Sequence, residues 1–266
     1  SPGSLLDRKP DQTPSGQVRT AGTSMAAAQV AGVAALLRRR RSTLTERAVR
    51  NVLMSTTKAL QGRWQPEVGF GLVRGSRGST NGPPGALEWL DGTTPQAYVR
   101  TTLTDAGLRA LVASLDDANC PDIVVLNREV PDADVELRLG LAAKHVSGPE
   151  PVRRSGKRWV YVRFTNRSLV DHAGEVVVFS VDKRGDDYLL DEIGSSGPAR
   201  PVAPGDFAVV GMGELSMDHD GLLVVVGDRP GELQARQLGS VANALPGDVV
   251  HSLVLANAGL GLRRLA

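Results

Sequence analysis

The hydrophobic pattern is dominated by a long apolar stretch near the N-terminus. Between Met25 and Leu37 only Gln29 is polar, and the remaining positions are Ala, Val, Leu or Gly after the initial Met. A helix that is apolar around its whole circumference is typical of a protein core. The pattern therefore predicts a buried helix over 25–37. The four arginines that follow favour its end, because cations are stabilised at the negative end of a helix dipole.

A second helix is predicted directly after these arginines. Thr43 and Glu46 have the spacing of a capping box, in which a hydroxyl and a carboxylate cap the first turn. Six residues then share one face at helical spacing: Leu44, Ala48, Val49, Val52, Leu53 and Thr56. We expect a half-exposed amphipathic helix that begins at Thr43.

Turn-forming residues divide the chain after this helix. Residues 69–73 (Gly-Phe-Gly-Leu-Val) are typical of a turn into a short strand. Residues 76–87 are rich in Gly, Ser and Pro, which is linker composition. This pattern predicts a first domain over 1–75, whose first 22 residues have the composition of a loop, and a linker over 76–87.

The part of the chain that follows the linker mixes two periodicities. A helical face is predicted over 108–115, a buried strand over 123–126 and a period-two strand over 135–141. We therefore expect a small α/β unit over 88–150.

Short β-rich runs separated by turns fill the last part of the chain. They lie at 159–165, 175–181, 188–190, 207–210 and 222–226. Such runs close naturally into two packed sheets, and helical spacing returns over 232–245. We expect a mainly antiparallel β-sandwich over 156–266, which makes the fold class of the whole chain α/β.

The charge is unevenly distributed along the chain, although the net charge is only +2. Residues 1–80 carry 13 Lys and Arg against 4 Asp and Glu, and the remainder carries 18 against 25. This asymmetry suggests separate domains. The basic segment has no stacking platform or groove-reading motif, so no nucleic-acid partner is expected.

The cysteine content and the lengths of the apolar runs argue against disulfide-rich, zinc-binding and membrane-spanning proteins. Cys120 is the only cysteine, which supports neither a disulfide scaffold nor a zinc module. No apolar run reaches the ~18 residues that span a bilayer, so no membrane partner is expected. The first four residues lack the features of a targeting signal and suggest a cut inside a longer protein.

Ser24 is the strongest candidate for chemistry. It follows Gly22 and Thr23 at the start of the predicted buried helix. The first amides of a helix have no intrahelical acceptor and lie at the positive end of the dipole, so an oxyanion would be stabilised there. Gly22 would leave room for a substrate backbone. The alternative is that Thr23 or Ser24 only caps the helix.

The run Gly-Thr-Ser-Met-Ala-Ala-Ala-Gln-Val-Ala-Gly over 22–32 resembles the active-site serine signature of the subtilases. Three further landmarks follow the order of that family: Ser-Pro-Gly at 1–3, the amphipathic helix over 44–59, and Gly-Phe-Gly-Leu-Val at 69–73. The resemblance covers roughly residues 1–75.

This resemblance implies a subtilisin-like serine endopeptidase that acts on polypeptides without a cofactor. Ser24 would be the nucleophile, and Gly22 and Thr23 would contact the substrate. The family has Pro-His where this chain has Ala28 and Gln29, and both changes are compatible with a helix.

The catalytic Asp, the His and the oxyanion Asn of a subtilase all precede the serine. The resemblance therefore implies that this chain holds the C-terminal part of a catalytic domain and is inactive alone. It also favours an extracellular or envelope location.

The histidines offer another source of a base. His145, His172, His219 and His251 all follow Ser24, an order that would suggest an α/β-hydrolase. Such an enzyme needs a buried strand before the serine, and residues 17–22 do not have that pattern. The neighbourhoods Asp171-His172 and Asp218-His219-Asp220 are charged and turn-like, so we expect the histidines to be surface residues.

Acidic pairs and aromatic residues have plain structural explanations. The pairs Asp116–Asp117, Asp132 with Asp134, and Asp186–Asp187 lack the ligand spacing of a calcium loop, so no metal site is expected. Trp159, Tyr161 and Phe164 are expected in the core of the β-region rather than on a ligand platform.

Residues 86–266 resemble an accessory β-domain that follows protease domains in bacterial caspase-like and subtilase-like proteins. The strands at 160–164 and 178–182 and the Pro204-Gly205 turn carry this likeness. It implies an interaction or regulatory module with a protein partner, and it supports a second hypothesis in which the chain is non-catalytic.

Overall fold

The computed structural model divides the chain into two compact units, residues 1–43 and 44–266. The structure describes residues 11–12, 18–19, 22–58, 71–78, 82–90, 96–102, 105, 114–131, 135, 156–198, 200–227 and 244–265. Within this part of the chain, no helix is long and apolar enough to cross a membrane.

The first unit contains a two-residue ladder and one long helix. Strands β1 (Asp11–Gln12) and β2 (Val18–Arg19) pair antiparallel, and α1 spans Thr23–Arg40. The helix predicted over 25–37 is therefore confirmed, but its expected burial is wrong. Only Leu37 is buried, and Met25 and Leu36 are 49% and 48% exposed. The sequence gives α1 an apolar surface, but burial needs a second element to cover it.

The second unit begins with α2 (Glu46–Ser55), which is amphipathic as predicted. Ala48, Val49 and Val52 are buried. The N-cap is Thr45 rather than Thr43: Thr45 is extended, and its Oγ1 accepts a hydrogen bond from the Ala48 amide at 3.1 Å. A cap hydroxyl must reach an amide two or three residues ahead, and Thr45 meets this requirement because the helix begins at Glu46.

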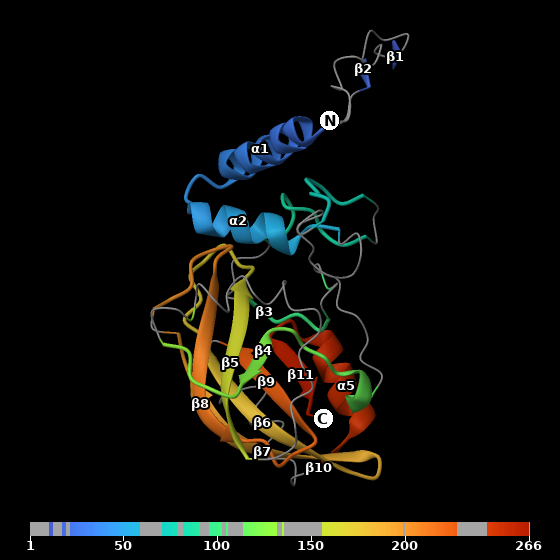
Figure 1. The fold of residues 1–266 in the computed structure, drawn as a ribbon, viewed down its shortest axis with the longest axis vertical. Helices are drawn as coiled ribbons and strands as arrows, with labels where there is room; N and C mark the ends of the chain where they lie inside the picture. The colour runs from blue at the N-terminus through green and yellow to red at the C-terminus, as the bar shows by residue number, and fades with distance from the viewer. Residues whose placement is uncertain are drawn as a thin grey trace, which may run out of the picture. The chain divides into compact units, whose positions relative to one another are not determined.

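Strand β5 (Lys157–Asn166) organises the first of two large antiparallel sheets (Figure 1). Along one edge β5 pairs with β3 (Ala97–Tyr98) and β4 (Ile123–Leu126), and along the other it pairs with β8 (Phe207–Ser216). Thus β3 and β4, which lie in the range predicted as a separate α/β unit, hydrogen-bond to the strand that follows it. The domain boundaries drawn around residues 76–87 and 151–155 stay predictions.

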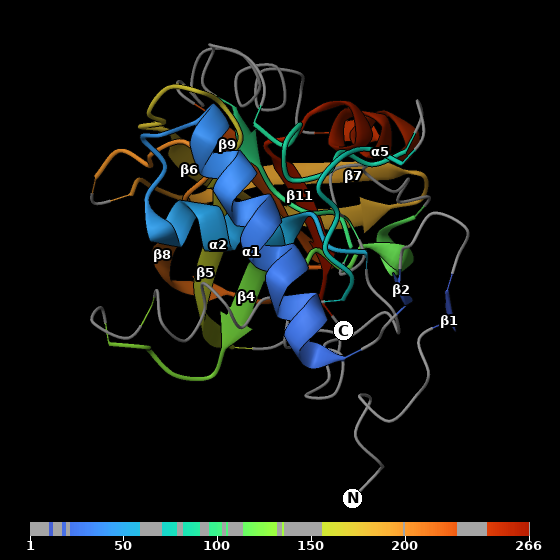
Figure 2. The same cartoon turned by 90° about the horizontal axis from the view of Figure 1, so that it is seen from above.

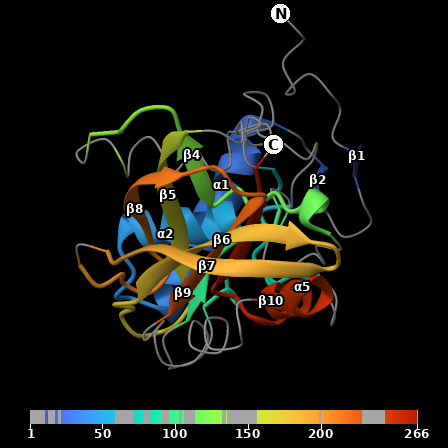
Figure 3. The same cartoon turned by 90° about the horizontal axis from the view of Figure 1, so that it is seen from below.

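The second sheet has five antiparallel strands in the order β10-β7-β6-β9-β11. Its strands are β6 (Glu175–Arg184), β7 (Asp187–Ser196), β9 (Gly221–Gly227), β10 (Ala244–Pro246) and β11 (Leu260–Arg264). Strands β6 and β7 form the long hairpin that crosses the view from below in Figure 3. Gly185 makes its turn with a positive φ of 64°, which glycine adopts without a Cβ clash.

Two hydrophobic clusters lie on opposite faces of the five-stranded sheet. Alternate residues of β6, such as Val176 and Val178, belong to a cluster shared with Val162 and Phe164 of β5. The intervening residues belong to a second cluster that Val250 and Val254 of α5 (Gly247–Ala256) complete. The continuous apolar run in β6 therefore forms a strand with both faces covered.

The strands predicted at 123–126, 159–165, 175–181, 188–190, 207–210 and 222–226 are all confirmed. Phe164 and Tyr161 are buried as expected, and Trp159 is half-buried. The mixed α/β class and the antiparallel sheets are therefore as predicted.

Other predicted elements differ from the structure. Val135 has helical conformation rather than the extended form predicted for 135–141, and Leu245, the last residue of the helical spacing at 232–245, lies in β10. Residues 136–141 and 232–243 lie outside the described residues. Of the turn into a short strand predicted over 69–73, Leu72 forms a single bridge with Lys58, and residues 69–70 lie outside the described residues. Leu115 begins a 3-10 turn (Leu115–Asp117), and the rest of the helical face predicted over 108–115 lies outside the described residues.

The predicted linker is partly packed. Gly85 is buried, and the Ala86 and Leu87 amides donate hydrogen bonds to the carbonyls of Arg74 and Gly75 at 2.8 and 2.9 Å. A Cβ at Gly85 would come within 2.6 Å of the Ser76 backbone. Only glycine fits at this close approach, so its presence here reflects packing rather than linker flexibility.

Candidate functional site

Ser24 occupies the first turn of α1, and its side chain is exposed. The first intrahelical hydrogen bond runs from the Ala26 amide to the Gly22 carbonyl at 3.1 Å. The amides of Thr23, Ser24 and Met25 therefore precede the intrahelical ladder and are directed toward the N-terminal end. This end of a helix favours negative charge, so a ligand oxyanion beside Ser24 would be stabilised.

The capping alternative for this serine is wrong in the structure. The N-cap residue is Gly22, which has extended backbone, and both Thr23 and Ser24 lie inside the helix. All three residues are exposed. The Ser24 hydroxyl is thus on the helix terminus without serving as its cap.

His172 is buried, which contradicts the expectation of a surface residue. It is 1% exposed, and its Nδ1 accepts a hydrogen bond from the Gly174 amide at 2.9 Å. Its backbone forms a bridge with Val202, and its ring lies 5.5 Å from the Phe164 ring. A Cβ at Gly174 would come within 2.0 Å of the His172 ring. These contacts make His172 a packing residue of the β-region.

His251 is also buried, at 5% exposure, and its Nε2 lies 2.9 Å from the Tyr188 hydroxyl. Burial lowers the pKa of His251, against the raising effects of Asp117 and Asp248. Burial also raises the pKa of Tyr188. A desolvated imidazole beside a desolvated phenol stays neutral and holds α5 against β7.

The remaining two histidines are His219 and His145. His219 is half-buried, and its Nδ1 lies 2.9 Å from the Asp182 carboxylate. His145 lies outside the described residues. Each described histidine therefore has a partner within the β-rich unit, by which we mean the two large antiparallel sheets and α5 of the second compact unit.

A buried charge cluster surrounds Asp122, and the sequence pattern did not predict it. Asp122 is 0% exposed, and its carboxylate accepts hydrogen bonds from the Arg100 amide at 2.8 Å and the Arg100 Nε at 3.0 Å. The Nη1 of Arg163 lies 3.6 Å from the same carboxylate. The arginine at position 163, inside the otherwise apolar run 159–164, was the signal for this cluster, because a buried charge must be paired.

The electrostatics of the cluster follow from burial and pairing. Burial alone would raise the pKa of Asp122, but Arg100 and then Arg163 lower it below its usual range. Burial lowers the pKa of Arg163 to about 10 despite the attraction of Asp122. The arginines thus keep Asp122 ionised. Asp122 has no exposed surface on which to meet a substrate, so the role of the cluster is structural.

Polar side chains of α2 bond to the sheet strands, over which Figure 2 shows the helix lying. Asn51 donates from Nδ2 to the Gly205 carbonyl at 2.8 Å and accepts from Arg163 Nη2 at 2.7 Å. Arg47 donates to the Asp206 carboxylate at 2.6 Å and to the Phe207 carbonyl at 2.7 Å. These bonds attach α2 to β5 and to the start of β8.

The predicted acidic pairs serve ordinary structural contacts. Asp116 pairs with Arg264 at 3.1 Å on the surface, and Asp117 accepts a hydrogen bond from the Ser114 hydroxyl at 2.8 Å. The Asp186 carbonyl accepts from the Gly247 amide. In the part of the chain that the structure describes, no three His, Cys, Asp or Glu side chains are grouped as metal ligands would be. Asp132 and Asp134 lie outside that part.

Comparison with known proteins gives one match and one negative result. Residues 2–71 match the Subtilase family, peptidase family S8, and no curated protein matches the chain. The matched range contains the run over 22–32, α1 and α2, and it crosses the boundary between the two compact units. Residues 2–71 are therefore similar to the Subtilase family (peptidase family S8), and Ser24 lies in the Gly-Thr-Ser-Met-Ala run of that segment.

Proposed function

We propose that this chain contributes the nucleophile of a serine-type endopeptidase, with Ser24 as the attacking residue. The observation that carries the proposal is the position of Ser24 inside the subtilase-matched segment, exposed on the first turn of a helix. Gly22 and Thr23, which precede it, would lie against the substrate backbone. The substrate class is polypeptide.

The reaction needs a base that takes the proton of the Ser24 hydroxyl. The described histidines have partners within the β-rich unit, which supports a base supplied from elsewhere. We propose that an Asp and a His from a segment outside these 266 residues complete the triad.

The chemical steps would follow those of other serine peptidases. The Ser24 Oγ bonds to the scissile carbonyl carbon while its proton passes to the histidine. The amide of Ser24 donates to the resulting oxyanion. The histidine then protonates the leaving amine, and water hydrolyses the acyl-enzyme.

Fluorophosphonate labelling tests this proposal. We expect no labelling of the 266-residue chain, and rapid labelling at Ser24 once the chain is extended upstream by a segment that carries the Asp, His and Asn. Ser24→Ala should abolish both labelling and peptide cleavage in the extended protein. Ser42→Ala is the matched control, because Ser42 is also an exposed serine of the first unit.

Two results would overturn the assignment. Stoichiometric labelling of the 266-residue chain would mean that the base lies within it. Cleavage near the wild-type rate in Ser24→Ala would mean that another residue attacks the peptide.

A non-catalytic interaction module is the second candidate function. It is favoured by α2, which lies in the subtilase-matched segment but is bonded to the β-rich unit through Arg47 and Asn51. In this reading residues 156–266 form a sandwich-like accessory domain with a protein partner. An extended protein that folds but neither reacts with fluorophosphonate nor cleaves peptides would support this function over the first.

A further inference from the structure

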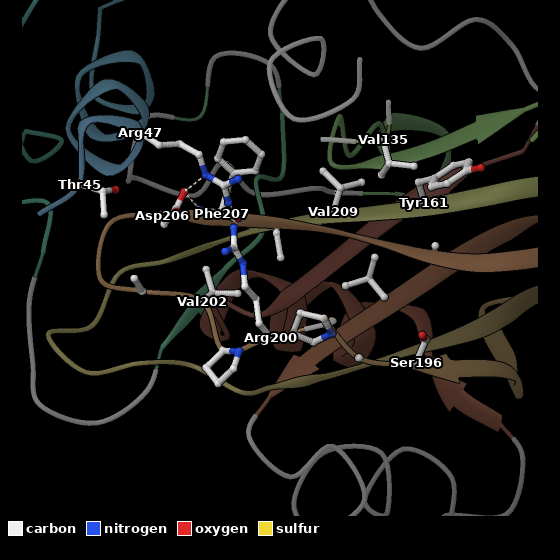
Figure 4. Close-up of a pocket in the computed structure, with 17 residues that line it drawn as sticks. Thr45, Arg47, Val135, Tyr161, Ser196, Arg200, Val202, Asp206, Phe207 and Val209 are labelled. Carbon is white, nitrogen blue, oxygen red and sulfur yellow. Dashed lines mark hydrogen bonds and ion pairs between the residues drawn. The ribbon is translucent and has the colours of Figure 1, made fainter. Parts of the chain in front are cut away.

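A pocket of about 640 Å³ lies beside the first half of β8 (Figure 4). One wall is β8 from Phe207 to Gly211, and the other is formed by residues 196–198 and 200–203, which follow from the end of β7 toward β8. Tyr161 and Val135 line one end, and Arg47 and Asp206 line the other. All of these residues belong to the second compact unit.

The pocket borders an open edge of a sheet. Among the described residues β8 pairs only with β5. The Asn166 amide bonds to the Asp206 carbonyl, and residues 165 to 161 face 207 to 211 in unbroken register. Hydrogen-bonded pairs alternate along an antiparallel ladder. The backbone groups of Val209 and Gly211 are therefore directed away from β5, toward the pocket.

The opposite wall is held in place by its own bonds. The Val202 amide and carbonyl both bond to the His172 backbone, at 2.8 and 2.9 Å. Asn166 Nδ2 also donates to the Val202 carbonyl at 2.7 Å. At the far end of β8 the Leu215 side chain packs close to Gly194 of β7, where a Cβ would lie 3.4 Å from it. The groove is thus preformed, which lowers the entropic cost of binding.

The charge of the groove is positive. The lining contains three charged residues, Arg47, Asp206 and Arg200. The charge of Arg47 is neutralised by its ion pair with Asp206. The third, Arg200, is exposed and extends into the pocket, and it has no hydrogen-bond or ion-pair partner among the described residues. A guanidinium in this position complements a carboxylate.

We propose that this groove binds an extended polypeptide segment, which adds to β8 as a further antiparallel or parallel strand and presents an acidic side chain to Arg200. Main-chain bonds to Val209 and Gly211 would supply affinity, and Arg200 would supply the preference for an acidic residue. This site is independent of Ser24 and of the proposed proteolysis.

Binding of designed peptides to the full 266-residue chain tests the proposal. The probe is a labelled nine-residue peptide of alternating Thr and Val with one central Glu, and its partner peptide has Lys instead of Glu. We expect the Glu peptide to bind about three- to tenfold more tightly than the Lys peptide. Amide exchange at Val209 and Gly211 should slow when it binds, because their amides then donate to the added strand.

Peptides with methylated backbone amides distinguish strand addition from other modes of peptide binding. Methylation of alternate amides on one edge of the Glu peptide should abolish binding, and methylation on the other edge should leave it unchanged, because an added strand uses only one edge. If both methylated peptides bind equally well, or if free glutamate competes as effectively as the peptide, the strand model is wrong.

Substitution of Arg200 tests the charge preference. Arg200→Glu should reverse the preference, so that the Lys peptide binds better, and Arg184→Glu should not, because Arg184 is an exposed arginine outside the groove lining. An unchanged preference in Arg200→Glu contradicts the proposal. Concentration-dependent dimerisation that protects the same two amides without peptide would instead assign the edge to a second copy of this chain.

Discussion

Asn51 of α2 accepts a hydrogen bond from Arg163 of β5 at 2.7 Å, although 112 positions separate the two residues in the chain. Both side chains are buried, at 1% and 6% exposure. The bond joins a helix of the subtilase-matched segment to the central strand of the β-rich unit. Unfolding of α2 and unfolding of the sheet are therefore expected to be coupled.

Asn51→Ala should lower the free energy of unfolding of the chain by about 1–3 kcal/mol, because the Gly205 carbonyl and Arg163 each lose a buried partner. Urea unfolding followed by circular dichroism measures the loss. Arg50→Ala is the control, since Arg50 is exposed on the same helix, and its effect should stay within about 0.5 kcal/mol. Equal effects of the two substitutions would contradict the proposed coupling.

Asp122→Asn should be among the most destabilising single substitutions in the chain. It leaves the buried guanidiniums of Arg100 and Arg163 without their shared carboxylate, and removing one partner of a buried pair costs about 3–5 kcal/mol. Urea midpoints compared at pH 7 test the expectation. Asp116→Asn breaks a surface pair with Arg264 in which the Asp116 side chain is 68% exposed, and it should cost at most about 1 kcal/mol.

Stability should fall as the pH is lowered below about 6.5, in part through His251. Burial lowers the pKa of His251 from 6.5 in the folded chain, so the unfolded chain binds the proton more readily. The contribution of neutral His251 to the free energy of unfolding is complete above pH 6.5, and it is lost as the pH falls through the pKa of His251 in the folded chain. Melting temperatures between pH 8 and pH 5 should decline less steeply in His251→Gln than in the wild type. Parallel curves would exclude His251 as a source of the dependence.

The two candidate caps of α2 can be separated by substitution. Thr45→Ala should cost about 1 kcal/mol because the Ala48 amide loses its acceptor. Thr43→Ala should have little effect, because Thr43 is exposed and precedes the helix. Thermal unfolding of both variants gives the comparison. A larger loss for Thr43→Ala would restore the cap expected from the sequence.

Short β-rich runs bounded by turns predicted the strands well, and in the structure both faces of a strand such as β6 meet apolar partners. In β6, Val176 and Val178 face one cluster and Val177 and Phe179 face the other. Short polar turns such as that at Gly185 set the limits of the hairpin. Local information was therefore sufficient to predict these strands, but their order in the sheets depends on contacts distant in sequence.

The site residues were predictable only where chemistry coincides with a local motif. Ser24 is recognisable because the run around it is contiguous. The Asp122 cluster joins residues 100, 122 and 163, and the groove joins β8 with the segment before it. No local periodicity encodes such combinations. His172 was misplaced at the surface for the same reason, since its cover comes from Val202 and Phe164.

The thiol of Cys120 can be used to measure local opening of the folded chain. Cys120 is 0% exposed, its Sγ donates to the Arg100 carbonyl at 3.0 Å, and burial raises its pKa to about 12. A protonated, inaccessible thiol does not react with alkylating reagents. Modification of the native chain therefore requires the region around Asp122 to open first, and the rate of alkylation measures the population of that opened state.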